Sequence, residues 1–186
     1  MRIISGIFKG KKIEFLKSAV TRPLRDFVKE SMFNIINHSN SINIKLENTN
    51  VLDLYSGIGS FGIECISRGA KTATFVENDN KALNVLKNNL NNLKIKEQFE
   101  IFNEKTASFL NRTGNKDKFE IIFFDPPFDE DFFINELDLL RNSKIYKKKH
   151  LVIVHREIKS KDEIEKKMNI LLDKTYGRSK IIFGTF

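Results

Sequence analysis

From residue 51 onward, short apolar runs alternate with segments whose apolar positions recur at helical spacing. In segment 81–93, for example, leucines at every third or fourth position line one helical face. We therefore expect strands at 51–55, 72–76, 99–102, 119–124 and 151–155, and helices at 60–67, 81–93, 107–111 and 131–141. Strands that are apolar throughout and alternate with helices are buried on both faces, so the pattern predicts a parallel, doubly wound α/β sheet.

The first 50 residues carry a different pattern. Two apolar-bearing runs, 2–5 and 11–16, flank glycines and predict a small β-hairpin. Apolar positions in 24–36 recur at helical spacing behind Pro23, a residue suited to the first turn of a helix. A polar loop over 37–50 is expected to separate this part from the strand that follows.

The C-terminal end predicts two more strands. The runs 168–172 and 180–186 are apolar and lie on either side of Gly177, so we expect an antiparallel pair at the sheet edge. We find no internal repeat and no low-complexity linker. The expected organisation is a single domain over 1–186, with a hairpin and helix appendage over 1–37 and a Rossmann-like core over 48–186.

Composition restricts the class of protein. The 186 residues are 40% hydrophobic, yet no apolar run approaches the roughly 20 residues that cross a bilayer. The first residues lack the features of a secretory signal, so we expect a cytoplasmic protein with no membrane partner. One cysteine, Cys65, allows neither an internal disulfide nor a thiolate zinc cluster, and we expect it to be a buried apolar group. His38 and His150 are expected in exposed loops, and no metal is predicted.

Positive charge is concentrated at the N-terminus. Residues 1–29 hold eight basic and two acidic side chains, which accounts for +6 of the net charge of +8. A solvated face of a lysine-rich chain would have this composition. So would a binding surface for a polyanion, because clustered basic side chains release condensed counterions when they meet phosphates. The candidate nucleic-acid-binding residues are Arg2, Lys9, Lys11, Lys12, Arg22 and Arg25.

Glycines follow the first core strand. The stretch from Asp53 to Gly62 runs from a buried strand into Gly57 and Gly59, and glycines there let main-chain N–H groups approach a ligand closely. A nicotinamide cofactor is the default interpretation of such a turn. Asp53, however, suits a cationic amino-acid ligand better than a pyrophosphate. Glu77 ends the next strand, where a carboxylate can accept hydrogen bonds from a ribose in either kind of site.

The fourth predicted strand ends in Asp125, Pro126, Pro127 and Phe128. A strand that simply ends at two prolines, with an aromatic side chain packed behind them, would have the same sequence. The functional interpretation is that the prolines fix the backbone, so that one main-chain carbonyl and the Asp125 carboxylate point at one place. Two such acceptors can orient an exocyclic amine of a nucleobase for methyl transfer, and Phe128 can stack on a base turned out of its surroundings.

With these motifs in place, the chain resembles the bacterial RsmD family, which methylates N2 of a guanine in small-subunit ribosomal RNA. The resemblance extends over the whole length and includes the opening residues 1–6, Arg22-Pro23, Asp26, Lys29-Glu30, Phe33-Asn34 and 67–70. It implies a class I S-adenosylmethionine-dependent methyltransferase fold with a mostly parallel seven-stranded sheet. It also implies a small N-terminal hairpin that helps to hold RNA.

The resemblance assigns roles by position. Asp125, Pro126, Pro127 and Phe128 would form the catalytic target-amine pocket, with Arg22 and Asp26 near its mouth. The cofactor S-adenosyl-L-methionine would be held by Asp53, Tyr55, Gly57, Gly59, Glu77, Asn78, Glu104 and Lys105. The chain departs from the family pattern at Leu24-Arg25, at Lys105 near the expected adenine, where Asn103 is a further candidate, and at His155, where an acid is usual.

Two alternatives stay open beside a ribosomal RNA methyltransferase. An adenine N6-methyltransferase of DNA or RNA would share the Asp-Pro-Pro-Phe motif, although 186 residues leave little chain for reading a DNA sequence. A noncatalytic RNA-binding protein on a methyltransferase scaffold would keep the fold. We expect a monomer that acts on small-subunit ribosomal RNA or on an assembly intermediate of the small subunit.

Overall fold

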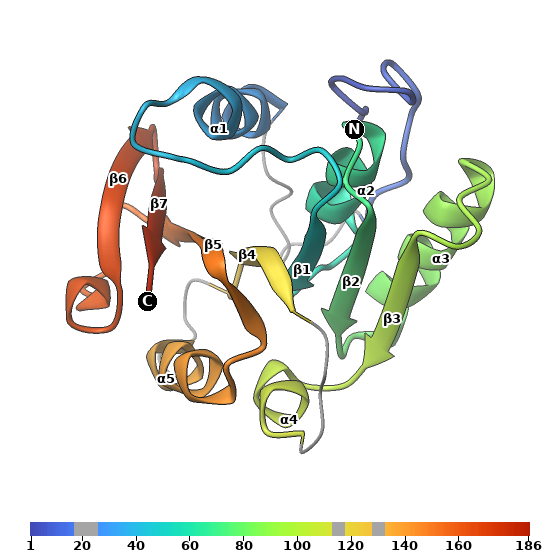
Figure 1. The fold of residues 1–186 in the computed structure, drawn as a ribbon. Coiled ribbons are helices and arrows are strands. Elements are labelled where there is room, and N and C mark those ends of the chain that lie inside the picture. Colours follow the sequence, from blue (N-terminus) through green and yellow to red (C-terminus); the bar gives the residue numbers. More distant parts are fainter. Residues whose placement is uncertain (17–25, 113–117, 128–132) are drawn as a thin grey trace.

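The computed structural model describes residues 1–16, 26–112, 118–127 and 133–186. Seven strands form one sheet, and helices flank it (Figure 1). The strands are β1 (Asn50–Leu54), β2 (Thr72–Glu77), β3 (Phe99–Asn103), β4 (Phe119–Phe124), β5 (Tyr146–Glu157), β6 (Asn169–Tyr176) and β7 (Ser179–Thr185). The helices are α1 (Asp26–His38), α2 (Ser60–Ser67), α3 (Asn80–Asn92), α4 (Thr106–Leu110) and α5 (Phe133–Ser143), with a 3-10 turn at Ile164–Lys166.

The strand order is β3-β2-β1-β4-β5-β7-β6. The first five strands in this order are parallel, and β7 runs antiparallel to both β5 and β6. The predicted parallel doubly wound sheet with an antiparallel pair at one end is therefore confirmed. β1 lies between β2 and β4. The chain passes from β1 to β2 on one side, whereas β4, which comes later in the sequence, pairs with β1 on the other side. Ligands of open α/β sheets bind at the carboxyl ends of strands at such a switch point.

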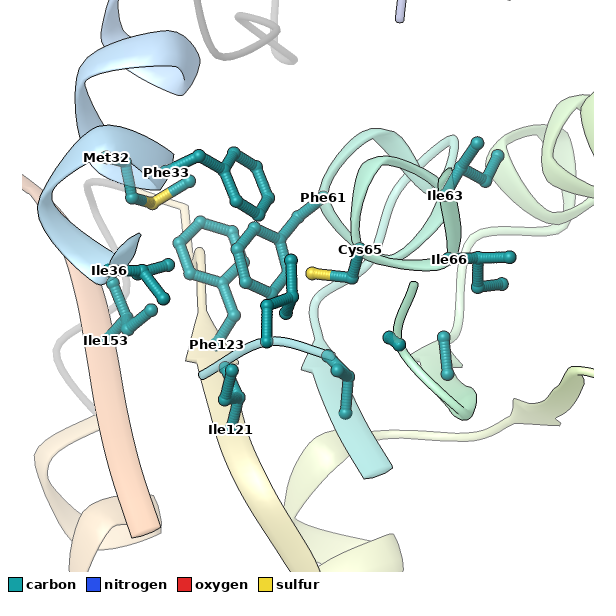
Figure 2. Close-up of a cluster of buried hydrophobic side chains, with 14 of the residues drawn as sticks. Met32, Phe33, Ile36, Phe61, Ile63, Cys65, Ile66, Ile121, Phe123 and Ile153 are labelled. Atoms are coloured by element: carbon teal, nitrogen blue, oxygen red, sulfur yellow. The ribbon is translucent and has the colours of Figure 1, made fainter. Parts of the chain in front are cut away.

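Helices cover both faces of the sheet (Figure 1). One apolar cluster joins α1, α2 and α3 to the sheet, and a second joins α4 and α5 to the opposite face. The alternation of side chains along β4 divides its aromatic residues, since Phe123 belongs to the first cluster and Phe124 to the second. Figure 2 shows Phe61 of α2 between the sheet and α1. Its ring stacks on those of Phe123 and Phe33, with ring centroids 4.2 and 5.4 Å apart, respectively.

The predicted strand at 151–155 is longer in the structure. β5 spans Tyr146–Glu157, because its carboxyl half continues to pair with β7 through Arg156 and Glu157. These charged residues end the apolar run, so the sequence pattern stopped too early. His150 lies in this strand and is buried, so its prediction as an exposed loop residue was wrong. His38 is exposed as expected, but it is the last residue of α1 and not a loop residue, and Cys65 is buried as expected.

The N-terminal part is less regular than predicted. Within residues 1–16, one bridge pairs Arg2 with Lys12, although main-chain hydrogen bonds still close the turn between the two runs. The segment 37–50, predicted to be a polar loop, contains Ile42, Ile44 and Leu46, which are buried in the first apolar cluster. Alternate side chains of this segment thus pack on the core, although its main chain does not pair with a neighbouring strand. No helix among the described residues has the length and apolar character to cross a membrane.

Candidate active site

The glycine-rich loop leaves β1 at its carboxyl end. Ser56 N–H donates to the carbonyl of Val76 in β2 at 3.0 Å, which anchors the loop to the neighbouring strand. Gly57 and Gly59 then adopt φ angles of 54° and 82°, a left-handed conformation that favours glycine. A Cβ on Gly57 would meet no atom within 4 Å, so this side of the loop faces open space. A ligand can therefore approach the main chain there.

Asp53 lies beneath this loop and is 1% exposed. Its Oδ2 accepts a hydrogen bond from Gly62 N–H at 2.9 Å, which ties β1 to the first turn of α2. Burial raises the pKa of the Asp53 carboxyl well above its ordinary value, and the charges of Asp125 and Glu77 add to this effect. Three carboxylates thus gather at the ends of β1, β2 and β4. A cation placed among them would be stabilised.

Glu77 connects two loops at the end of β2. Its Oε2 accepts from Gly57 N–H at 2.8 Å, and its Oε1 accepts from the N–H groups of Asn78 and Asp79, each at 2.8 Å. The side chain therefore holds the glycine-rich loop beside the N-terminus of α3. Its position next to the loop agrees with the expected ribose carboxylate, a role that stays a prediction.

The Asp-Pro-Pro corner follows β4, the direct neighbour of β1. Leu54 pairs with Phe124, and Asp125 N–H donates to the carbonyl of Leu54 at 3.3 Å. The corner and the glycine-rich loop therefore leave adjacent strands at the same edge. The Asp125 side chain is 28% exposed and Pro126 is buried. Phe128 lies outside the described residues.

Two β5 residues brace this corner. His155 Nδ1 lies 2.7 Å from Asp125 Oδ1, and the Arg156 guanidinium donates to the carbonyl of Pro127 at 2.8 Å. Arg156 is itself held by Asp162 and lies over the Phe133 ring at 4.3 Å. Sequence reasoning noted His155 as a departure and missed Arg156. The available signal was their position, directly after an apolar run on a strand expected beside β4.

The family model described as Conserved hypothetical protein 95 matches residues 1–185. The chain belongs to this family. It is 34% identical over 178 residues to the ribosomal RNA small subunit methyltransferase D of Haemophilus influenzae, covering 95% of this chain and 89% of the relative. It is 30% identical over 160 residues to the Escherichia coli protein of the same description, covering 86% of this chain and 76% of that protein. The family expected from the motifs is confirmed.

A solved structure agrees with this assignment. A putative methyltransferase from Escherichia coli superposes with a TM-score of 0.84 at 26% sequence identity, covering 99% of this chain and 96% of that one. The superposition extends over the N-terminal part as well as the sheet. The class I methyltransferase fold expected from the resemblance is therefore confirmed.

The N-terminal part of this family member docks onto the far end of α2. The carboxylate of Glu64 accepts from the N–H groups of Ile4 and Ser5 at 2.8 and 3.0 Å and from Arg68 at 2.7 Å. Lys29 of α1 lies 3.5 Å from the same carboxylate, and both side chains are 0% exposed. Burial lowers the pKa of Lys29, which the charge of Glu64 partly offsets. This buried cluster joins the appendage to the helix that begins at the glycine-rich loop.

The predicted nucleic-acid-binding residues fall into two groups. Arg2, Lys9, Lys11 and Lys12 are exposed on the docked segment, with Arg2 3.7 Å from Asp26. Arg22 and Arg25 lie outside the described residues. The same segment carries Ile7, which is 75% exposed. Their role in binding RNA stays a prediction.

The remaining predicted cofactor residues border the loop on both sides. Tyr55 has a φ of 59°, and its hydroxyl donates to Glu136 of α5 at 2.6 Å. Asn78 and Lys105 are exposed beyond β2 and β3. Glu104 forms an ion pair with Arg112 at 2.7 Å. Glu104 N–H donates to the carbonyl of Glu77 at 3.1 Å, so the ends of β2 and β3 lie side by side, and which of these residues reads the adenine stays a prediction. Within the described ranges, no cluster of three or more His, Cys, Asp or Glu side chains has a metal-holding arrangement.

Proposed function

We propose that this protein methylates the exocyclic N2 amine of a guanine in small-subunit ribosomal RNA, with S-adenosyl-L-methionine as the methyl donor. The observation that carries the proposal is the exit of the glycine-rich loop and the Asp-Pro-Pro corner from the adjacent strands β1 and β4. The names of the relatives support a ribosomal RNA acceptor in the small subunit.

The described residues fit the cofactor. Gly57 leaves open space beside the main chain, the Glu77 carboxylate accepts from its N–H, and Asp53 lies beneath the loop, where a bound cation would favour its ionised form. S-adenosyl-L-methionine carries a sulfonium and an ammonium, so its positive charges suit this group of carboxylates. When bound, the cofactor supplies an electrophilic methyl carbon. Asp53 would face its methionine part and Glu77 its ribose hydroxyls.

The corner after β4 would hold the target amine. Because Arg156 donates to the carbonyl of Pro127 and His155 occupies Oδ1 of Asp125, the acceptors directed at the amine are Oδ2 of Asp125 and the carbonyl of Pro126. Two acceptors fix the amine so that its lone pair points along the methyl-transfer direction, and catalysis then rests on orientation and electrostatics. Asp125 or water takes the proton that the methylated amine releases.

The test is incubation of the protein with cofactor labelled on the methyl group. Naked small-subunit ribosomal RNA, assembled small subunits and plasmid DNA serve as separate acceptors, and nuclease digestion identifies the modified nucleoside. We expect label in N2-methylguanosine from one of the ribosomal acceptors. Label in N6-methyladenine would support the adenine methyltransferase instead, and no label in any acceptor would support a noncatalytic RNA-binding protein.

The matched variant is Asp125→Ala. We expect methyl transfer to fall about 100- to 1000-fold, the loss typical when one oriented polar group is removed from a transition state. Cofactor affinity measured by calorimetry should change little, because Asp125 contacts the amine and not the donor. Turnover equal to wild type would remove Asp125 from the reaction.

A further inference from the structure

A lysine-lined hollow lies at the amino ends of β1 and β4, at the edge of the sheet opposite the Asp-Pro-Pro corner. It has a volume of about 770 Å³. We call it the lysine hollow and define it by Lys45, Lys118, Lys147, Lys148 and Lys149, with Glu120 among them. All five lysines are exposed. None of them belongs to the N-terminal basic group that the sequence singled out.

A bulge in β5 creates this surface. Phe119 of β4 pairs with Tyr146, and Ile121 pairs with Leu151, so β5 advances five residues while β4 advances two. The additional residues carry Lys147–Lys149. In a regular strand, three consecutive side chains would alternate between the two faces of the sheet, and one would be directed into a packed layer. The bulge instead leaves all three lysines exposed.

His150 holds the bulge in place. Its Nε2 accepts from the main-chain N–H of Phe186 at 3.0 Å, so its Nδ1 carries the proton and donates to the carbonyl of Lys147 at 2.8 Å. Burial lowers the pKa of His150, which favours this neutral form. The C-terminal residue of the chain and the first lysine of the bulge are thus fixed by one buried ring. Bulges held this way are built features of a fold.

The charge in the hollow is poorly balanced. Lys147 pairs with Glu120, whose other oxygen accepts from Asn50 N–H at 2.8 Å, and Lys149 donates to Asn43 at 3.2 Å. Five lysines against one carboxylate leave a net charge of +4 on the residues that define the hollow. Like charges held this close repel one another, so an anion that binds among them gains free energy.

We propose that the lysine hollow is a second RNA-binding surface that contacts phosphates of the ribosomal substrate. The proposal rests on the proposed function for the nature of the polyanion. Lysine ammonium groups are point charges that bind phosphate without reading a base. The one aromatic ring in the lining is that of Tyr146. It packs against His150 and Phe186, and its hydroxyl donates to the main-chain carbonyl of Arg141. The Tyr146 ring is therefore not available for stacking on a base, and the proposed contact is to the phosphate backbone of the RNA.

The position of the hollow specifies the kind of RNA. β4 separates it from Asp125 by six residues, which span about 20 Å at the rise of a strand. RNA that reaches both places must extend around the end of the sheet. A folded ribosomal RNA or an assembled particle meets this requirement.

The test replaces the charges of Lys45, Lys148 and Lys149 with glutamine in one triple variant. Lys147 and Lys118 are left intact because Lys147 pairs with the Glu120 carboxylate and Lys118 donates to a main-chain carbonyl. Lys149, by contrast, contacts the neutral, exposed side chain of Asn43. The RNA concentration at half-maximal methylation should rise about 10-fold at physiological salt, with kcat unchanged. RNA binding measured by filter retention without cofactor should lose about three units of salt slope, one for each lysine. The corresponding triple arginine variant should retain wild-type affinity and slope.

The matched control is a triple glutamine variant at Lys159, Lys161 and Lys174, exposed lysines after β5 and in β6. It should leave the salt slope within one unit of wild type. Equal loss in both variants, or no loss in the hollow variant, would overturn the proposal. Filter binding tests the hollow even if wild-type protein transfers no methyl group, so failure here and failure of the proposed function are distinguishable.

Discussion

The imidazole of His155 lies against the carboxylate of Asp125, with Nδ1 and Oδ1 2.7 Å apart. An ionised carboxylate can only accept, so Nδ1 donates. The His155 side chain is 6% exposed, whereas that of Asp125 is 28% exposed. The contact therefore holds one oxygen of Asp125 from the protein interior, while the side chain stays partly exposed.

We predict that His155 positions Asp125 through this donated hydrogen bond. His155→Leu should lower kcat by about 10- to 100-fold, because a hydrogen bond to a charged group contributes roughly 1.5–3 kcal/mol. His155→Asn should restore most of the rate, since its amide nitrogen can take the place of Nδ1. His155→Gln carries its amide one bond farther out and should not. The RNA concentration at half-maximal rate should be the same in all three.

Steady-state methylation of RNA with each variant separates these outcomes. If the leucine and asparagine variants lost the same activity, or if only the half-saturating RNA concentration changed, the donated hydrogen bond would not be the function of His155. Thermal melts accompany the assays, because a general packing defect would lower stability in parallel with rate.

A second prediction concerns the buried charge of Asp53. Its folded-state pKa is raised, so its protonated form stabilises the fold fully below the unfolded pKa, and this stabilisation is lost as pH rises through the folded pKa. Asp53→Asn keeps an oxygen for Gly62 N–H without the charge. The stability of the variant should therefore not fall as pH rises through the folded pKa of Asp53, so the variant becomes more stable than wild type above that pKa, and the two are equally stable below the unfolded pKa.

The same substitution should weaken cofactor binding. Affinity for S-adenosyl-L-methionine in wild type should increase as pH rises through the folded pKa of Asp53, because the ionised form attracts the cation. In Asp53→Asn the affinity should be lower and independent of pH over that range. Calorimetric titrations and urea unfolding at matched pH values measure both effects. A variant that is less stable than wild type at neutral pH would contradict the burial argument.

Gly57 of the loop and Gly62 of α2 should respond differently to substitution by alanine. A Cβ at Gly62 would lie 2.3 Å from the Phe75 ring, so Gly62→Ala should cost about 1–3 kcal/mol of stability through overpacking. A Cβ at Gly57 would meet nothing within 4 Å, so Gly57→Ala costs the roughly 1–2 kcal/mol of a left-handed residue with no clash.

Cofactor affinity distinguishes the two positions. The methyl group of Gly57→Ala enters the open side of the loop, so binding should weaken at least about 10-fold, or 1.4 kcal/mol. Gly62→Ala faces the interior and should affect affinity less than stability. Calorimetry and thermal melts of both variants provide the comparison. Unchanged affinity in Gly57→Ala would show that the ligand does not approach this side.

A fourth prediction concerns the buried pair of Glu64 and Lys29. Glu64→Gln leaves the Lys29 ammonium buried without its counter-charge and should destabilise the protein by about 3–5 kcal/mol. The double variant Glu64→Gln/Lys29→Met removes both charges and should recover part of that loss. Urea unfolding of the two single variants and the double variant completes the cycle. A cost below about 1 kcal/mol for Glu64→Gln would mean that the pair does not hold the appendage.

Local chemistry explains why much of the fold could be predicted. The apolar runs of β1 and β4 and the helical spacing in α3 depend on neighbouring residues alone, so their positions are legible in the chain. β4 and α2 agree with their predicted bounds. The glycine-rich loop and the Asp-Pro-Pro corner are short contiguous motifs that indicated an amino-group methyltransferase, and residues 1–6 and Arg22-Pro23 narrowed the resemblance to the family.

The contacts between distant residues required the tertiary structure. His155 meets Asp125 across 30 positions and Glu64 meets Ile4 across 60, and no local pattern encodes which side chains two elements bring together. The sequence by itself determined the strands, the helices and the two motifs, because backbone preference and hydrophobic period act over a few residues. Tertiary packing decided the buried pair between α1 and α2, and strand register decided the brace behind Asp125 and the lysine-bearing bulge in β5, since each depends on where separate segments meet.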